Sequence, residues 1–466
     1  MTFQLTTRRA ALFAAAALTA ALYLADLAGM GLVSTDEPRY ADIGRAMASS
    51  GDWITPRLWG QPWFEKPPLL YWLIGLGFRA GLGTELAPRL PVALLSLGFL
   101  AFFWFHVRSL WDERVATFAT VILSTSAGWL ALSHVAVTDV PMAALFTAAV
   151  LFAMAQRNTA AAAALGFAVL AKSLVPVVLF APVAAVGYRR WREWLKPAPV
   201  LVFLAIAVPW HVLAFVRNGY EFVRVLFVQQ QVGRFISPER QHAQQWWYYL
   251  PVFLLFLYPW FPLLPFAARN WRDRRTMTLL AVVLFGLIFF SGSLNKLATY
   301  VLPLLPATCI LIGIGLARTP RHAVAPILAI SSSVVLLGAL PFAAAVVPAA
   351  VAVGLSGAPR PWNELAFGFP VAAAAGILLV PLFRIGTTRV AWGSAFGLAG
   401  LAFLWFQFAA FPALDRAASA RPMWRRQHPE CAPELDRSVL YGLYYYSGGA
   451  LPGCAVLDRT HARVVR

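Results

Sequence analysis

The chain has 466 residues, of which 60% are hydrophobic and only 12% are charged. Soluble domains carry about 25% charged residues, whereas apolar stretches of about 18 or more residues are typical of membrane spans. The composition therefore predicts a polytopic membrane protein. The net charge of +18 does not indicate nucleic-acid binding, because the basic residues gather in short runs between apolar segments, as in cytoplasmic loops.

The N-terminus combines a short basic segment, residues 6–9, with an apolar stretch over 10–32. This start resembles a secretory signal peptide with a basic n-region. Because the apolar stretch is long, we expect an uncleaved first membrane span with Arg8 and Arg9 on the cytoplasmic side. The polar segment that follows is then expected outside the cytoplasm.

Residues 34–71 follow this span and mix acids and bases with aromatic side chains. A simple tether between two helices does not need such a set, so we interpret the segment as the catalytic loop of a membrane enzyme. Its second part, residues 67–81, is apolar but contains Arg79, which predicts an amphipathic helix in the outer interface. The charged members of the loop are Asp36, Glu37, Arg39, Asp42, Arg45, Asp52, Arg57, Glu65 and Lys66.

The rest of the chain alternates apolar segments with basic turns. We expect a pair of helices over 160–188 that meets near Lys172 at the outer face, because one helix would bury that charge. With this pair the chain has about 13 spans, and every densely basic turn lies on one side. The other expected spans cover 90–107, 115–132, 140–155, 197–216, 248–266, 277–291, 297–316, 323–347, 365–383 and 390–411.

This topology predicts an all-α membrane domain over 1–411, with external loops at 33–89 and 217–247. A small external tail over 412–466 follows, and its YGLYYY and AVLD segments suggest strands, so we expect a mixed structure there. The tail holds Cys431 and Cys454. Outside the cytoplasm these are expected to form a disulfide, and the alternative is two unpaired thiols.

The charged residues of the loops allow two readings each. Asp36 suits a general base or a metal ligand at the membrane surface, but Thr35 or Asp36 could instead cap a helix that starts at Pro38. The basic residues Arg39, Arg45, Arg57 and Lys66 suit an anionic headgroup such as a phosphate, or pair with the acids of the same loop. Lys172 and Lys296 reach the same site or snorkel to the interface. An interfacial belt fits Trp59, Trp63, Trp246 and Trp247 better than a sugar platform.

Several other classes of protein lack support in the sequence. The chain has no Walker loop, no dinucleotide GxGxxG and no zinc-type Cys/His spacing. A secondary transporter would carry ionisable residues near the midplane and internal repeats, whereas here the charges gather at the outer surface. The pattern favours an enzyme that acts on material at that face, with a lipid transporter or flippase as the alternative.

The motifs of the chain resemble one family of membrane enzymes. The strings DEPRYADIGRAM (36–47) and GDWITPRLWGQPWFEKPPLLYWL (51–73) resemble the first external loop of the bacterial lipid A aminoarabinose transferases, which are C-type membrane glycosyltransferases. These are related more distantly to the dolichyl-phosphate-mannose protein mannosyltransferases. Further similar strings, in order, are APRLP (87–91), the TD of Thr138 and Asp139, LAKSLVP (170–176), GRFISPE (233–239) and NKLATYVLPLLPA (295–307).

The resemblance implies an inverting transfer of a sugar from a polyprenyl (undecaprenyl) phosphate at the periplasmic face of the bacterial inner membrane. Asp36 matches the proposed catalytic carboxylate, and Asp139 matches a second external acid. The residues matched to the donor phosphate are Arg39, Lys66 and Tyr300, with which we group Tyr40 and Lys296.

The resemblance leaves the metal and the acceptor open. Glu65 matches a glutamate near a bound metal, but QQQ at 229–231 stands where the family often has histidines, with His242 as the nearby candidate ligand. No cofactor is certain, and a divalent metal ion is the one considered. Lipid A is the first acceptor considered, but the tail is short for the lipid A enzyme. Another sugar, or a protein or other glycan acceptor, is therefore the alternative, and membrane lipids are expected partners.

Overall fold

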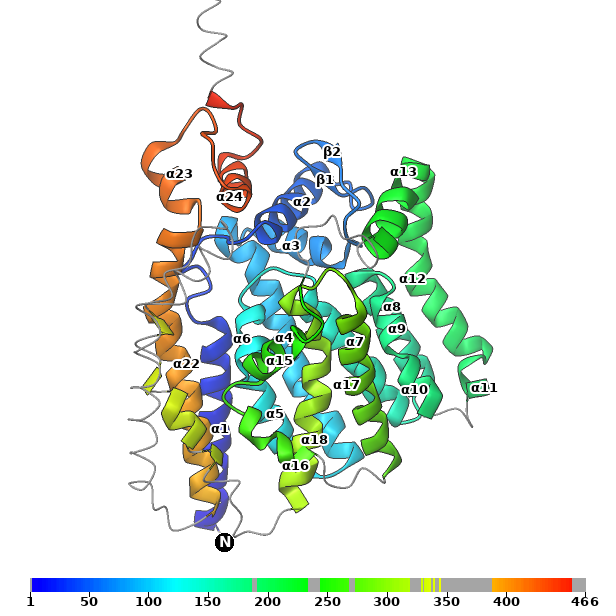
Figure 1. The fold of residues 1–466 in the computed structure, drawn as a ribbon, viewed down its shortest axis with the longest axis vertical. Helices are drawn as coiled ribbons and strands as arrows, with labels where there is room; N and C mark the ends of the chain where they lie inside the picture. The colour runs from blue at the N-terminus through cyan, green and yellow to red at the C-terminus, as the bar shows by residue number, and fades with distance from the viewer. Residues whose placement is uncertain are drawn as a thin grey trace, which may run out of the picture.

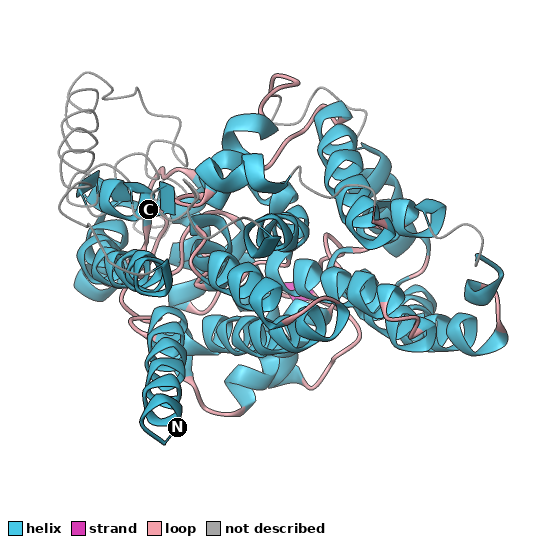
Figure 2. Ribbon diagram, turned by 90° about the horizontal axis from the view of Figure 1, so that it is seen from below, coloured by secondary structure: helices cyan, strands magenta, loops and turns pink. Residues whose placement is uncertain are grey.

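The computed structural model describes residues 2–186, 191–233, 244–267, 273–318 and 388–454, with short pieces between 328 and 344. Most of this chain is helical, in agreement with the all-α prediction, and Figure 2 shows one short hairpin among the helices. In Figure 1 the long helices stand side by side, and α1 rises from the N-terminus toward a cap of shorter elements at the other end.

The bundle consists of helices joined by short connections. It comprises α1 (Thr2–Leu24), α4 (Gly83–Leu110), α5 (Glu113–Ser124), α6 (Ala127–Ser133), α7 (Asp139–Met154), α8 (Asn158–Lys172), α9 (Val175–Leu179), α10 (Ala181–Val186), α11 (Trp191–Trp194), α12 (Pro197–Asn218), α15 (Tyr249–Leu257), the 3₁₀ helix η3 (Phe261–Leu263), α16 (Leu264–Ala267), α17 (Arg274–Gly292), the 3₁₀ helix η4 (Ala298–Leu304), α18 (Leu305–Arg318) and α22 (Thr388–Ala418).

Within the described residues five helices are long and apolar enough to cross a membrane. Two bent helix pairs, α5–α6 with an angle of 60° and α15–α16 with an angle of 101°, raise the number to seven if each pair is one span. The chain is thus a multi-pass membrane protein. The expected spans at 323–347 and 365–383 lie wholly or largely outside the described residues.

The predicted helix break near Lys172 is confirmed. Helix α8 ends at Lys172, and Ser173 takes a positive φ of 56° before α9 begins at Val175. Pro176 lies in the first turn of α9, where its missing N–H costs nothing. The sequence KSLVP therefore interrupts the helix and leaves the lysine at a helix end.

The expected catalytic loop is largely ordered into secondary structure. It forms α2 (Asp36–Ser50), a hairpin of β1 (Arg57–Leu58) and β2 (Gln61–Pro62), and α3 (Leu69–Arg79), which confirms the helix predicted over 67–81. With α13 (Tyr220–Val223) and the π-helix η2 (Arg224–Gly233), these elements belong to the cap in Figure 1.

The strand prediction for the tail is wrong. The YGLYYY segment lies in helix α24 (Arg437–Ser447), which follows α23 (Arg421–Gln427). The Asp436 carboxylate caps α24 by accepting from the Ser438 N–H at 2.9 Å, and Leu443 and Tyr445 are buried. Tyrosines favour strands, but here the N-cap and the burial of one helix face stabilise a helix instead. The AVLD segment lies outside the described residues.

A buried ion pair between Glu37 and Arg89 joins the cap to the bundle. Both side chains are 0% exposed, and Nε of Arg89 donates to Oε1 of Glu37 at 2.7 Å. Glu37 also accepts from the backbone N–H of Val33 at 2.9 Å and of Ala136 at 3.0 Å. The remaining N–H groups of Arg89 donate to backbone carbonyls of the α1–α2 connection, including that of Gly31 at 2.9 Å. One pair therefore ties α2, α4 and two connections together.

We expect Glu37→Gln to destabilise the protein by about 3–5 kcal/mol, because it leaves the Arg89 guanidinium buried without its counter-charge. The measurement is thermal unfolding in detergent. The matched control is Glu113→Gln, whose exposed pair with Arg108 spans 3.7 Å and is worth about 0–1 kcal/mol. Equal unfolding temperatures for the two variants would contradict this role for Glu37.

Candidate active site

Four charged residues meet at the junction of α2 and the hairpin, and we call them the Arg39 cluster: Asp36, Arg39, Glu65 and Lys66. Nη1 of Arg39 donates to Oε2 of Glu65 at 2.7 Å, and its Nη2 donates to Oδ1 of Asp36. Nζ of Lys66 donates to Oε1 of Glu65 at 3.1 Å. The cluster combines two acids and two bases that stand far apart in sequence.

Exposure separates the roles within this cluster. The side chains of Arg39 and Glu65 are 7% and 4% exposed, whereas that of Asp36 is 35% exposed. Asp36 is therefore the acid of the cluster that a substrate can reach. Glu65 is buried and binds both Arg39 and Lys66.

The environment also fixes protonation states. Burial alone would lower the pKa of the Arg39 guanidinium, but the Glu65 and Asp36 carboxylates raise it overall, so Arg39 stays cationic. Burial, with help from the Asp36 and Glu65 charges, raises the pKa of Tyr40 well above its usual value. Tyr40 therefore remains a neutral phenol beside the cluster rather than an anion.

The alternative that Thr35 or Asp36 caps a helix is not realised. Helix α2 begins at Asp36 itself, and its N-cap residue Thr35 makes no side-chain cap bond. The Asp36 carboxylate accepts from Arg39 instead. The acid is thus committed to the cluster and not to the helix terminus.

The other basic residues of the loop follow the pairing alternative. Arg45 donates to Asp42, and Arg57 lies 3.9 Å from Asp52. Arg39 and Lys66 also have an acidic partner, but theirs is the shared and buried Glu65.

A second group, the Asp139 cluster, lies at the facing ends of α7 and α8. Nζ of Lys172 donates to Oδ1 of Asp139, and both side chains are nearly buried. The same ammonium group lies 4.7 Å from the centroid of the Tyr300 ring. Three residues that the sequence analysis singled out are thus brought together, although only Asp139 and Tyr300 were matched to family positions.

Both clusters lie at the capped end of the bundle. Phe64, the neighbour of Glu65, packs in one apolar group with Leu170, two residues before Lys172. Trp210 of α12 and Phe222 of α13 belong to the same group, so both helices pack at this side. These residues thus lie at one end of the bundle, and Figure 1 shows the cap above it.

Lys296 lies apart from these contacts. Its side chain is buried, and Nζ donates to the carbonyls of Ser293 and of Gln244, the latter at 3.1 Å. Burial lowers the pKa of this ammonium group. Its described partners are backbone carbonyls, so a nearby anion would be a stronger partner for the charge.

The described residues do not form a site for the metal ion considered above. No group of three or more histidine, cysteine, aspartate or glutamate side chains in that part of the chain is arranged to hold a metal ion. Both oxygens of Glu65 accept from cations, Arg39 and Lys66. His242, the other candidate ligand, lies outside the described residues.

The tryptophans divide between two environments. Trp246 and Trp247 are 75% and 52% exposed, as a membrane-interface belt requires. Trp59 instead packs on the tail, with its ring 5.1 Å from Tyr441 and 5.0 Å from Tyr444. Trp59 is half-buried, and for this residue the belt interpretation stays a prediction.

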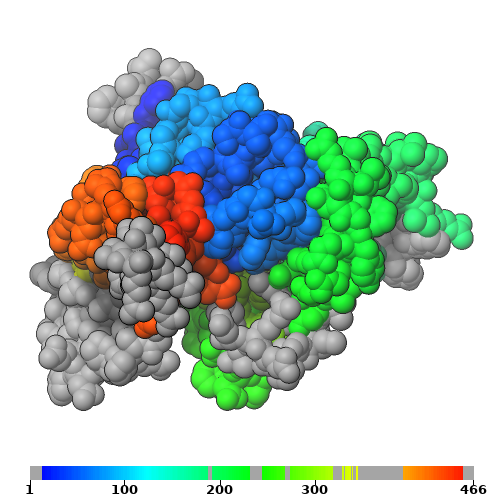
Figure 3. Space-filling model, turned by 90° about the horizontal axis from the view of Figure 1, so that it is seen from above, coloured from blue at the N-terminus to red at the C-terminus, as the bar shows by residue number. Residues whose placement is uncertain are grey.

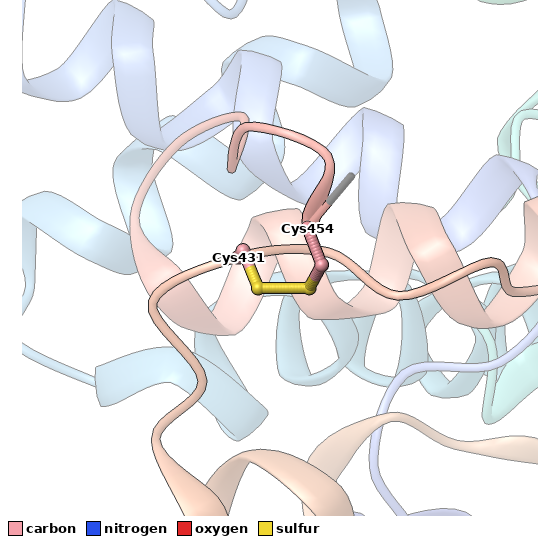
Figure 4. The surroundings of a disulfide bond; sticks show 2 residues. All are labelled: Cys431 and Cys454. Carbon is pink, nitrogen blue, oxygen red and sulfur yellow. A yellow bond between two sulfur atoms is a disulfide. The ribbon is translucent and has the colours of Figure 1, made fainter. Parts of the chain in front are cut away.

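The tail itself was missed as part of the site. The centroid of the Tyr441 ring lies 5.6 Å from Cζ of Arg39, and that of Trp63 lies 5.7 Å from the same atom. A disulfide joins Cys431 to Cys454, the pair that the sequence predicted, and so closes a loop that contains α24 (Figure 4). A tyrosine-rich segment inside a cysteine pair was the available signal.

Residues 65–213 match the model of the dolichyl-phosphate-mannose-protein mannosyltransferase family. The chain is 35% identical over 329 residues to the undecaprenyl phosphate-alpha-4-amino-4-deoxy-L-arabinose arabinosyl transferase of Pseudomonas paraeruginosa, covering 65% of this chain and 58% of that protein. Over this part of its length the chain is similar to the aminoarabinose transferases. The similar protein of Edwardsiella ictaluri is 33% identical over 315 residues, covering 62% of this chain and 56% of its own length.

A solved structure shares the fold. ArnT from Cupriavidus metallidurans, bound to undecaprenyl phosphate, superimposes with a TM-score of 0.73 at 25% identity. The match covers 95% of this chain and 89% of that one. By contrast, the sequence match spans only 58% of the first arabinosyl transferase named above.

We expect loss of the disulfide to loosen α24. Closing a loop with a sequence separation of 23 residues stabilises it by about 3 kcal/mol in the chain-entropy model. In a Cys431→Ser/Cys454→Ser variant, hydrogen exchange of the α24 amides should therefore accelerate. A reducing agent should accelerate it in the native chain and have no further effect in the variant. Unchanged protection in both cases would show that α24 is held by its packing alone.

Proposed function

We propose that this chain is an integral-membrane glycosyltransferase. It transfers a sugar, with 4-amino-4-deoxy-L-arabinose as the first candidate, from a polyprenyl phosphate to lipid A or a related acceptor. The observation that carries the proposal is the Arg39 cluster, an accessible acid beside two cations, on a fold shared with ArnT solved with undecaprenyl phosphate. The names of the arabinosyl transferase relatives support the same activity.

The donor phosphate exchanges with Asp36 on Arg39. Of the two acids that Arg39 contacts, Asp36 lies on the exposed side and Glu65 on the buried side. A phosphate oxygen that replaces Asp36 at Nη2 gains a charge-assisted hydrogen bond, and Glu65 keeps the guanidinium in place. Lys66 adds a second positive charge, and Tyr40 adds a neutral donor.

This exchange releases the base when it is needed. An oxygen of the acceptor attacks the anomeric carbon, and the bond between that carbon and the phosphate oxygen breaks. The electron pair leaves with the phosphate, where Arg39 and Lys66 stabilise the developing charge. Asp36, freed from Arg39, takes the proton of an acceptor hydroxyl or orients an acceptor that is already anionic. Attack opposite the leaving group inverts the anomeric configuration.

The Asp139 cluster and Lys296 provide further positive charge for the donor phosphate. Lys172 is shared between Asp139 and the Tyr300 ring, so its charge is held at the end of α8. Lys296 brings a buried charge with only backbone carbonyls as described partners. Both lysines suit an anionic phosphate headgroup.

The proposed location is the bacterial inner membrane, with about 13 spans and with the cap and tail at the periplasmic face. Two observations support it. The basic residues of the sequence gather in turns between apolar segments, as the positive-inside rule expects of cytoplasmic loops. The disulfide lies at the same end as the two clusters, and disulfides persist in oxidising compartments such as the periplasm.

The direct test uses the purified chain in nanodiscs with undecaprenyl phosphate-aminoarabinose and lipid A. Release of free undecaprenyl phosphate together with a mass increase of lipid A supports the proposal. Transfer only to another glycan or to a protein supports the alternative suggested by the mannosyltransferase match. An intact donor after a panel of lipid, glycan and protein acceptors counts against an enzyme and favours a lipid transporter.

We expect Asp36→Asn to reduce transfer by roughly 10²–10⁴-fold, because the amide takes no proton while it still accepts from Arg39. Turnover of donor is the measurement, and unchanged thermal unfolding shows that the fold is intact. The control is Asp52→Asn, a change in the same segment at an acid that pairs with Arg217 at 3.0 Å. A fully active Asp36→Asn variant would remove Asp36 from the mechanism.

A further inference from the structure

Helix α24 of the tail packs directly on the elements that carry the Arg39 cluster (Figures 1 and 3). Its Tyr445 is 0% exposed, and the carbonyl of this residue accepts from Nη1 of Arg45 in α2 at 2.9 Å. The Tyr445 hydroxyl donates to the carbonyl of Thr84 at 2.6 Å. The tail helix is thus anchored between α2 and α4, independently of the contact with Arg39.

The anchored helix presents Tyr441 to Arg39. The Tyr441 centroid lies 5.6 Å from Cζ of Arg39, within the range of a cation–π contact. On the solvent side Arg437 donates from Nε to the Tyr441 hydroxyl at 2.6 Å, which fixes the ring from its polar end. Cζ of Arg437 also lies 5.1 Å from the centroid of the Tyr441 ring, so the ring meets two cations and does not depend on Arg39 alone for its position.

The hairpin opposite α24 adopts a conformation that favours this contact. Trp59 and Gly60 have φ angles of 50° and 81° at the two central positions of the turn. Asn, Asp and Gly are preferred at such positions, and a bulky residue there is strained. The strained residue is Trp59, and its indole ring packs on both Tyr441 and Tyr444.

We propose that Tyr441 is a positioning residue for the transfer reaction, acting through Arg39. The proposal rests on the proposed function, because it concerns the moment when a phosphate replaces Asp36 on the guanidinium. At that moment Arg39 loses its contact with Asp36 and keeps its bonds to Glu65 and to the Thr35 carbonyl, which accepts from Nε at 2.8 Å. The Tyr441 ring, with Glu65 on the other side, keeps the guanidinium in place for the leaving phosphate.

Tyr444 provides a matched control. It lies on the same helix and packs on the same Trp59 ring, but its described contacts do not include Arg39. Tyr441→Leu removes one of the aromatic faces that Arg39 meets and leaves those of Trp63 and Tyr40. Tyr441→Phe retains the Tyr441 face. Tyr444→Leu removes comparable packing between the tail and the hairpin.

The experiment measures donor turnover, the inhibition constant of undecaprenyl phosphate, and thermal unfolding for the three variants. Cation–π contacts of about 0.5–2 kcal/mol correspond to roughly twofold to thirtyfold. We expect Tyr441→Leu to lower kcat and to weaken inhibition by undecaprenyl phosphate within that range, with little change in the KM for the acceptor. Tyr441→Phe should restore both values, and Tyr444→Leu should change unfolding as much as Tyr441→Leu does, without the kinetic loss.

Two results overturn the inference. Equal kinetics for Tyr441→Leu and Tyr444→Leu would show that the tail acts only through packing. A loss in Tyr441→Phe as large as in Tyr441→Leu would assign the effect to the hydroxyl instead of the ring. Failure of the proposed function is distinct, because the unaltered chain would then neither turn over the donor nor bind undecaprenyl phosphate.

Discussion

The ion pair between Glu37 and Arg89 is the constraint on which the capped end of the molecule depends. Two charges with 0% exposure are costly to bury, and they are tolerated because every side of the pair is hydrogen bonded to backbone groups of the surrounding connections. The pair fixes the rotation of α2. Successive residues of a helix point about 100° apart, so with Glu37 turned into the core its neighbour Asp36 faces the open side. The adjacent residues Glu37 and Asp36 thus belong to the buried core and to the candidate site, respectively.

The candidate site is built from segments that are distant in the chain. Helix α2 supplies Asp36 and Arg39, the end of the hairpin supplies Glu65, and the tail supplies Tyr441. The acids and bases of the Arg39 cluster balance one another before a substrate arrives, which allows Arg39 to be buried. The same balance makes the Asp36–Arg39 contact exchangeable, because an incoming phosphate replaces one anion with another.

The sequence predicted more of the membrane domain than of the cap. Apolar length and basic turns identified the long helices, and KSLVP marked the break after Lys172. The pairing of Cys431 with Cys454 followed from their shared place in the tail. The tyrosine-rich segment misled, because aromatic residues favour strands in general, while here a capped helix buries Tyr445 against α2 and α4.

Local chemistry was therefore determined by the sequence alone: the helical membrane segments, the motif with Asp36, Arg39, Glu65 and Lys66, and the presence of an acid and a lysine at the ends of α7 and α8. Only the tertiary structure decided which charges share a partner, that Glu37 is buried on Arg89, and that Tyr441 meets Arg39. The physical reason is that apolar periodicity and turn residues are local properties of a chain. The partner of a buried charge depends instead on which distant segments the packing brings within hydrogen-bond distance.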